Sequence, residues 1–198
     1  MSYELVVIGC SWGGLSALRK VLGPLPSTFP LPIVVAQHRS SQSTDGSMTA
    51  VLETYVSLAV SEADDKDSLE PGHIYIAPPD YHLLVERGSL ALSTDEKVRF
   101  SRPSIDVLLE SAADAYGTRL IAVILTGANE DGAIGIRRVS QMRGKSIVQD
   151  PGTAERAEMP QAAVDTGVVD MVLSLEDISE VLLSLAGAAD SRGGLHVV

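Results

Sequence analysis

A serine lies between glycines close to the start of the chain, in the segment Gly9-Cys10-Ser11-Trp12-Gly13. This segment follows a short apolar run and precedes a run of helical period, so it is expected to join a strand to a helix. In a nucleophile elbow, the flanking glycines permit a sharp turn that exposes the serine hydroxyl, and the helix N-terminus offers N–H groups to an oxyanion. The spacing therefore favours a nucleophilic Ser11. A plain turn in which Ser11 caps the helix is the alternative, and Cys10 is a minor alternative nucleophile.

The same glycines do not fit the common phosphate-binding loops. A dinucleotide fingerprint needs the spacing GxGxxG and an acidic residue about 20 positions further on. Here the glycines are Gly9, Gly13 and Gly14, and the next predicted strand ends in Gln37-His38. No Gly-Lys-Ser or Gly-Lys-Thr comes directly after these glycines, as a Walker loop would require. We therefore interpret the segment as an acyl-transfer site.

A serine nucleophile needs a base, and His38 is the best placed histidine. It follows the apolar segment PIVVAQ, which reads as the second strand. The carboxyl ends of parallel strands meet at one rim of a sheet, so His38 is within reach of Ser11. His73 and His82 fall in a hairpin region and His196 falls in the tail, so these three are expected to be structural or solvated.

A histidine base needs an acceptor that holds its ring, and the segment LIAVILTG leads directly to two acids, Glu130 and Asp131. Asp131 is the better placed of the two, because it begins a predicted helix and is followed by Gly132. Its alternative role is a helix N-cap. The chain order Ser, His, Asp differs from the order Ser, Asp, His of the α/β-hydrolases, and so disfavours that superfamily. The predicted catalytic residues are Ser11, His38 and Asp131.

The elements that would position these residues indicate an α/β fold. Short apolar runs alternate with segments of helical period, which predicts a doubly wound, mostly parallel sheet with helices on both faces. The predicted strands are 4–8, 32–36, 121–125, 146–148 and 169–173. The predicted helices are 14–22, 47–55, 104–116, 131–142, 160–166 and 175–185, with Ser104 and Ser174 as N-caps. The segment 73–94 predicts an antiparallel hairpin at one edge of the sheet.

Composition narrows the class of partner. The 198 residues are 45% hydrophobic and carry a net charge of −11, which argues against binding to nucleic acid or to an anionic membrane. A single cysteine excludes an internal disulfide and a multi-cysteine metal site. No apolar run approaches the roughly 20 residues of a membrane span, and the N-terminus lacks the pattern of a signal peptide. We expect one cytoplasmic domain over residues 1–187 and a flexible tail over 188–198.

Five motifs together resemble the catalytic domain of the CheB family of chemotaxis protein-glutamate methylesterases. They are IGCSWGG, the QH after the second strand, LEPGHIYIAPPDYH, RPSIDVLLESAA and VILTGANEDGA, and the resemblance extends over about residues 4–185. It implies a domain that hydrolyses glutamate γ-methyl esters on the cytoplasmic helices of chemoreceptors, releases methanol, and in many members also deamidates receptor glutamines. It implies no metal and no cofactor. Ser11, His38 and Asp131 match the catalytic residues of the family.

The chain departs from the family pattern around the serine. The family commonly has Ala-Ser-Thr-Gly-Gly there, whereas Cys10 and Trp12 flank Ser11 in this chain. The large ring of Trp12 could fill the substrate groove. The family commonly has Met-Pro after the histidine, and this chain has Arg39 and Ser40.

A second departure lies before the acid, where the family commonly reads Gly-Met-Gly-Asn-Asp-Gly and this chain reads Gly-Ala-Asn-Glu-Asp-Gly. The backbone N–H of Ala128 can still serve the oxyanion, but the pocket is expected to change shape. Arg102, in the motif RPSID, could orient an acidic substrate segment or pair with an acid to fix its loop. We therefore expect altered specificity more than altered chemistry.

The chain begins at its first predicted strand, so we expect no receiver domain within it. Control is then expected from a separate receiver or scaffold protein, or the domain is constitutively open. Two other functions stay open: a binding or scaffold protein that has lost esterase activity, which Trp12 favours, and a hydrolase of another small ester.

Overall fold

The computed structural model describes residues 2–38 and 47–187. Within these residues, seven strands form one sheet in the order β3-β4-β2-β1-β7-β8-β9, and all neighbouring strands are parallel. The strands are β1 (Leu5–Cys10), β2 (Ile33–Gln37), β3 (Ala59–Glu62), β4 (His73–Ile76), β7 (Leu120–Ile124), β8 (Lys145–Gln149) and β9 (Met171–Leu173). The predicted doubly wound, mostly parallel sheet is confirmed.

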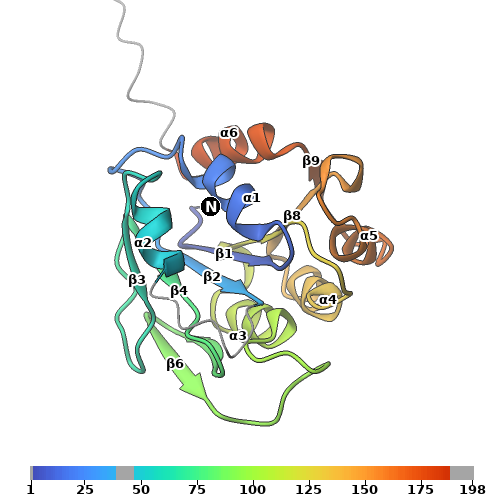
Figure 1. Cartoon of the computed structure of the whole chain (residues 1–198), viewed down its shortest axis with the longest axis horizontal. Coiled ribbons are helices and arrows are strands. Elements are labelled where there is room, and N and C mark those ends of the chain that lie inside the picture. Colours follow the sequence, from blue (N-terminus) through green and yellow to red (C-terminus); the bar gives the residue numbers. More distant parts are fainter. Residues whose placement is uncertain (1, 39–46, 188–198) are drawn as a thin grey trace, which may run out of the picture.

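Helices cover both faces of this sheet, and Figure 1 shows α1 and α6 on one side with α3 and α4 on the other. One face of the sheet packs against α1 (Gly14–Leu22), α2 (Ser47–Glu53) and α6 (Leu175–Leu185). The opposite face packs against α3 (Ile105–Tyr116), α4 (Ala133–Gln141) and α5 (Glu158–Val164). Successive side chains of a strand point to opposite faces. Val6 and Ile8 of β1 are therefore buried on the α1 face, and Leu5 and Val7 on the α3 face.

The predicted hairpin forms from β5 (His82–Glu86) and β6 (Ser89–Ser93), which pair antiparallel around Arg87-Gly88. In the described part of the chain it is a two-stranded sheet of its own and shares no ladder with the main sheet. The segment after β3 holds it in place, because the N–H of Lys66 donates to the carbonyl of Leu90 at 2.9 Å. The hairpin therefore lies beside the β3–β4 edge, at the lower left of Figure 1.

The first residues of the predicted hairpin belong instead to β4, a parallel strand of the main sheet. Ile74 and Ile76 are buried on the α1 face and Tyr75 on the α3 face. Burial on both faces requires helices above and below, which an edge hairpin does not have. The alternating pattern therefore indicated a strand correctly, but packing determined its partner.

Most helix ends follow local sequence signals. Ser104 accepts the N–H of Val107 at 3.4 Å and Ser174 accepts that of Asp177 at 3.2 Å, so both predicted N-caps are confirmed. Helices α1 and α6 have the predicted bounds. Helix α4 begins at Ala133, two residues after the predicted start, because a left-handed residue at position 132 forms the turn that enters it.

Three strand ends meet at the carboxyl rim of the sheet. Cys10 at the end of β1 pairs with Gln37 at the end of β2, and Gly9 pairs with Ile124 at the end of β7. The chain therefore leaves these neighbouring strands side by side, where the strand order reverses about β1. Open α/β sheets bind their ligands at such a point.

Some expectations lie outside the described residues, namely the flexible tail 188–198 with His196, and the pair Arg39-Ser40. Among the residues that are described, no helix combines the length and the apolar character that crossing a membrane requires.

Candidate active site

Ser11 lies in the turn that joins β1 to α1. Its N–H donates to the carbonyl of Thr126 and its carbonyl accepts the N–H of Gly14, both at 2.9 Å. Gly13 between them is left-handed, with φ of 77°, a conformation that glycine adopts without strain. A Cβ at Gly13 would also lie 2.7 Å from the carboxylate of Glu155. The strand, the sharp turn and the helix expected of the GxSxG segment are thus all present.

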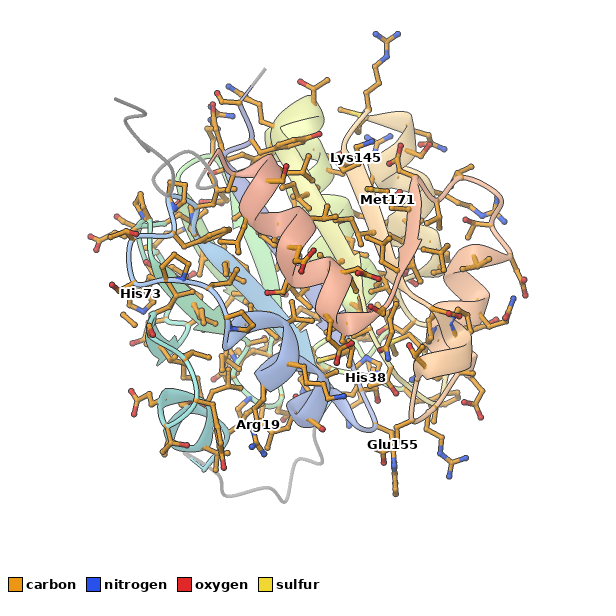
Figure 2. The ribbon with its side chains drawn as sticks, turned by 90° about the horizontal axis from the view of Figure 1, so that it is seen from above. Arg19, His38, His73, Lys145, Glu155 and Met171 are labelled. Atoms are coloured by element: carbon orange, nitrogen blue, oxygen red, sulfur yellow. The ribbon has the colours of Figure 1, made fainter. Side chains whose placement is uncertain are left out.

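His38 lies beside this turn. Its N–H donates to the carbonyl of Cys10 at 3.1 Å, which continues the pairing of β1 with β2 by one residue and brings His38 next to Ser11. Val34 and Ala36 of β2 are buried on the α3 face, so the alternation of the strand directs His38 to that face. Figure 2 shows His38 at the opposite end of the strands from Lys145, which begins β8.

Asp131 contacts His38 although the two residues lie 93 positions apart in the chain. Its Oδ2 lies 2.7 Å from Nε2 of the imidazole. The same oxygen accepts the N–H of Ile105 at 2.8 Å, and Oδ1 accepts the N–H of Asp106 at 2.9 Å and the hydroxyl of Ser104 at 3.1 Å. The carboxylate therefore sits at the N-terminus of α3, where N–H groups and the helix dipole favour an anion.

The charge of Asp131 follows from these contacts. The residue is 1% exposed. Burial by itself raises the pKa of its carboxyl, but the hydrogen bonds from His38 and from two backbone N–H groups more than offset burial, so the pKa lies below its usual value. Asp131 is therefore an anion at neutral pH and can hold the imidazole by charge as well as by position.

Glu130 as an alternative acid and Cys10 as an alternative nucleophile are less well placed than Asp131 and Ser11. Glu130 is exposed and pairs with Arg99. Cys10 is fully buried, and this burial raises the pKa of its thiol to about 12. A buried neutral thiol is a poor nucleophile. The geometry therefore favours Asp131 over Glu130 as the acid and Ser11 over Cys10 as the nucleophile.

Two backbone N–H groups in the loops that follow β1 and β7 are candidate donors to an oxyanion. They belong to Trp12, the residue after the serine, and to Ala128, the predicted donor, which is exposed. Within residues 2–38 and 47–187, neither N–H donates to a protein acceptor. The hydroxyl of Thr126 donates to the carbonyl of Trp12 at 2.9 Å and so fixes the turn. A donor directly after the nucleophile and one from a neighbouring loop is the usual composition of an oxyanion hole.

The Trp12 ring lies towards the loop that follows β8 and is 60% exposed. Its Nε1 donates to Oε1 of Glu155 at 2.8 Å, and the guanidinium carbon of Arg156 lies 5.5 Å from the ring centroid. Sequence reasoning missed both partners, because nothing local connects residues that lie 143 positions apart. The ring is therefore held on the β8 side of the turn by charged neighbours.

Arg102 fixes its loop, the second of its two expected roles. Its guanidinium donates to Oδ1 of Asp80 from Nε and Nη2, at 3.2 and 2.9 Å, and to the carbonyls of Thr94 and Asp95 from Nη1, at 2.8 and 2.9 Å. The side chain thereby links the segment between β6 and α3 to the loop between β4 and β5.

The histidines of the hairpin region are structural, as expected. His73 stacks on Tyr75 with ring centroids 4.3 Å apart. His82 is 2% exposed, lies 3.0 Å from the carbonyl of Glu96, and accepts the N–H of Ser104 at 3.2 Å. Neither ring contacts the candidate catalytic residues.

Two polar residues around Asp131 were not predicted. Nδ2 of Asn129 lies 3.2 Å from Nδ1 of His38. Oδ1 of Asp106 accepts the N–H groups of Gly132 and Gly135 at 2.9 and 2.8 Å, which ties α3 to the start of α4. Burial raises the pKa of the Asp106 carboxyl to about 6. Both residues belong to motifs of the family resemblance, and that was their only sequence signal.

The fold and the site define a class: a doubly wound α/β protein with a serine, a histidine and a buried aspartate at the point where the strand order reverses, as in serine hydrolases. Comparison with known proteins identifies the family. The family model described as CheB methylesterase matches residues 6–182, and the chain belongs to this family.

Relatives agree with this assignment. A Leptospira interrogans protein, named provisionally as a protein-glutamate methylesterase/protein-glutamine glutaminase, is 47% identical over 186 residues, which are 93% of this chain and 96% of that protein. The protein-glutamate methylesterase FrzG of Myxococcus xanthus is 40% identical over 182 residues, 91% of this chain and 54% of FrzG. The sequence of this chain is 37% identical to that of the Thermotoga maritima CheB methylesterase catalytic domain. The crystal structure of that domain matches with a TM-score of 0.87 over 93% of this chain and 100% of that domain.

Proposed function

We propose that this chain is a serine hydrolase that removes methyl groups from glutamate γ-methyl esters on the cytoplasmic helices of chemoreceptors and releases methanol. The observation that carries the proposal is the contact of 2.7 Å between Nε2 of His38 and the buried carboxylate of Asp131, beside the serine turn of a CheB methylesterase fold. The relatives named protein-glutamate methylesterase support the choice of substrate.

The proposed reaction is acyl transfer in two halves. Asp131 holds Nε2 of His38, so Nδ1 is the nitrogen that takes the proton of the Ser11 hydroxyl. The serine oxygen attacks the γ-carbonyl carbon, and the N–H groups of Trp12 and Ala128 stabilise the oxyanion. The intermediate collapses, the bond to the methoxy oxygen breaks, and His38 returns the proton so that methanol leaves. Water then attacks the acyl-serine with the same base, giving the glutamate acid and free Ser11.

Deamidation of receptor glutamines is a second candidate function, which the names of the relatives favour. It uses the same steps with ammonia as the leaving group in place of methanol. The nitrogen of an amide is a poorer leaving group than the alkoxy oxygen of an ester, so proton donation by His38 to the leaving nitrogen matters more in this reaction.

The test is methanol release from a methylated receptor fragment, together with labelling by a sulfonyl fluoride. We expect turnover and labelling of Ser11, and a loss of at least about 10⁴-fold in rate for Ser11→Ala. Ser16→Ala serves as the matched control, because Ser16 is exposed on α1.

Other results would refute the proposal in different ways. Labelling of Cys10, or full activity of Ser11→Ala, would refute the assignment of the nucleophile. Turnover of nitrophenyl esters without any response to receptor would indicate a hydrolase of another small ester. Binding to receptor without any turnover would indicate a scaffold protein. Control by a separate receiver or scaffold protein stays a prediction.

A further inference from the structure

We propose that Asn129 is a positioning residue for His38: its side-chain amide holds the imidazole in the tautomer with the proton on Nε2 and the lone pair on Nδ1. This rests on the proposed function, in which Nδ1 accepts the Ser11 proton once the Asn129 amide has released the single lone pair of that nitrogen. Nδ2 of Asn129 lies 3.2 Å from Nδ1 of His38, and Oδ1 of Asn129 lies 3.1 Å from the backbone nitrogen of Asp131. One side chain thus contacts the histidine and the loop of its acid.

The orientation of the amide follows from its contact with the backbone. The N–H of Asp131 can only donate, so the Asn129 atom that faces it must be the oxygen. The NH₂ group then faces His38. Because an NH₂ group only donates, Nδ1 must accept with its lone pair. In a neutral imidazole the ring proton is therefore on Nε2.

The other side of the ring requires the same tautomer. Nε2 lies 2.7 Å from Oδ2 of Asp131, and an ionised carboxylate can only accept. Asp131 and Asn129 therefore act on the two ring nitrogens in the same sense. The second of these contacts depends on a residue that departs from the motif Gly-Met-Gly-Asn-Asp-Gly of the family resemblance, which has glycine where Asn129 stands.

The contact between Asn129 and Nδ1 exists only while Nδ1 is unprotonated. A proton on Nδ1 would face the NH₂ donor of Asn129, so the amide contact and that proton exclude one another. The charged groups on the elements packed against His38 are Asp131, which contacts Nε2, and Asp106, which lies behind Asp131. Nε of Arg99 lies 3.8 Å from the Asp106 carboxylate. These act on the Nε2 side, whereas Asn129 acts on Nδ1 itself.

Three substitutions separate this role from a structural one. Asn129→Ala removes the donor, Asn129→Asp replaces it with an acceptor of the same shape, and Glu130→Gln is the control in the same loop. We expect the acidic limb of the pH–rate profile to move up by about 0.5 to 1 pH unit in Asn129→Ala, and further in Asn129→Asp. Glu130→Gln should leave it in place. An equal loss of rate at every pH in both Asn129 variants, with the limb unmoved, would overturn the proposal.

Nitrogen NMR of the imidazoles tests the tautomer without turnover. The chain has four histidines, so the spectrum of His38→Gln assigns the His38 signals. We expect a protonated Nε2 and an unprotonated Nδ1 at neutral pH, and a titration midpoint that increases from the parent protein to Asn129→Ala to Asn129→Asp. A protonated Nδ1 in the neutral ring would overturn the proposal. Because these spectra do not require esterase activity, the expected spectra without methanol release would refute the proposed function and still support the role of Asn129.

Discussion

The two sides of the Ser11 turn are built in different ways. On the β2 and α3 side, Asp131 is 1% exposed and accepts hydrogen bonds from His38, from two backbone N–H groups and from a serine hydroxyl. On the β8 side, Trp12 is 60% exposed and is held by one hydrogen bond to Glu155 and by the nearby Arg156. On the first side the carboxylate is buried and hydrogen-bonded at both oxygens, whereas on the second side the ring is exposed and held by few contacts.

Because of this difference, we expect the two sides to have different roles in the proposed reaction. Proton transfer needs an imidazole held in one orientation, and burial with saturated hydrogen bonds provides that rigidity. Recognition of a protein segment benefits from an exposed aromatic ring with a charged group beside it. Substitutions on the buried side should therefore change the rate constant or the stability, and substitutions on the exposed side should change the apparent substrate affinity.

The largest expected effect is that of Asp131→Asn. The amide preserves the shape but removes the charge that holds the Nε2–H tautomer of His38, so we expect kcat to decrease on the order of 10³- to 10⁴-fold. Methanol release measures it, and circular dichroism checks that the fold is intact. Glu130→Gln is the control and should retain activity. The reverse result, with Glu130→Gln impaired and Asp131→Asn active, would assign the acid to the exposed residue and remove the distinction between the two sides.

A smaller effect on the buried side concerns stability and pH. Burial raises the pKa of Asp106 from 3.8 to about 6, so the folded protein favours the neutral acid. The stability that this group contributes is then full below about pH 4 and is lost as the pH rises to about 6. Asp106→Asn should remove this loss, which amounts to roughly 1 to 3 kcal/mol between pH 4 and pH 7.

Urea unfolding at both pH values measures this change. The control is Asp114→Asn, because Asp114 is exposed and pairs with Arg138 at the surface. Its effect should stay within about 0.5 kcal/mol and should not depend on pH. The same pH dependence in the parent protein and in Asp106→Asn would contradict the burial of an ionisable group behind Asp131.

On the exposed side, Trp12→Ala should raise KM for the receptor fragment by roughly three- to tenfold and leave kcat within about twofold. Loss of an exposed ring removes contact area for the substrate but leaves the His38–Asp131 pair intact. Steady-state methanol release separates the two constants. A large decrease in kcat with unchanged KM would show that the ring acts on the chemistry and not on recognition.

The smallest effect is expected for Glu155→Ala. Because Trp12 is the only tryptophan in the chain, its fluorescence reports on this contact. We expect a change in emission as the hydrogen bond to Nε1 is lost, with a decrease in stability below about 1 kcal/mol because the contact is exposed. Glu158→Ala, another exposed acid nearby in the sequence, is the control. An unchanged emission would contradict the contact between Glu155 and the ring.

Much of this molecule follows from patterns within its sequence. The apolar runs predicted five strands of the parallel sheet, and the periodicity predicted α1 and α6 to the residue. Because parallel strands end at a common rim, the positions of Ser11, His38 and Asp131 after three such strands predicted a shared rim, and His38 and Asp131 are in contact there. Ser104 was predicted as an N-cap from its type and place alone. These are local rules of the backbone, which a single sequence displays.

The tertiary structure decided what depends on residues far apart in the chain. It made β4 a buried strand and the hairpin a separate sheet, and it gave Arg102 a role in its loop. It brought Glu155 to Trp12 across 143 positions and Asn129 to His38 across 91. Residue type and spacing determine which groups reach the rim of the sheet. The packing of the loops against α3 decides which imidazole nitrogen of His38 faces Asp131 and which side chain contacts the second nitrogen. No local pattern in the sequence encodes that packing.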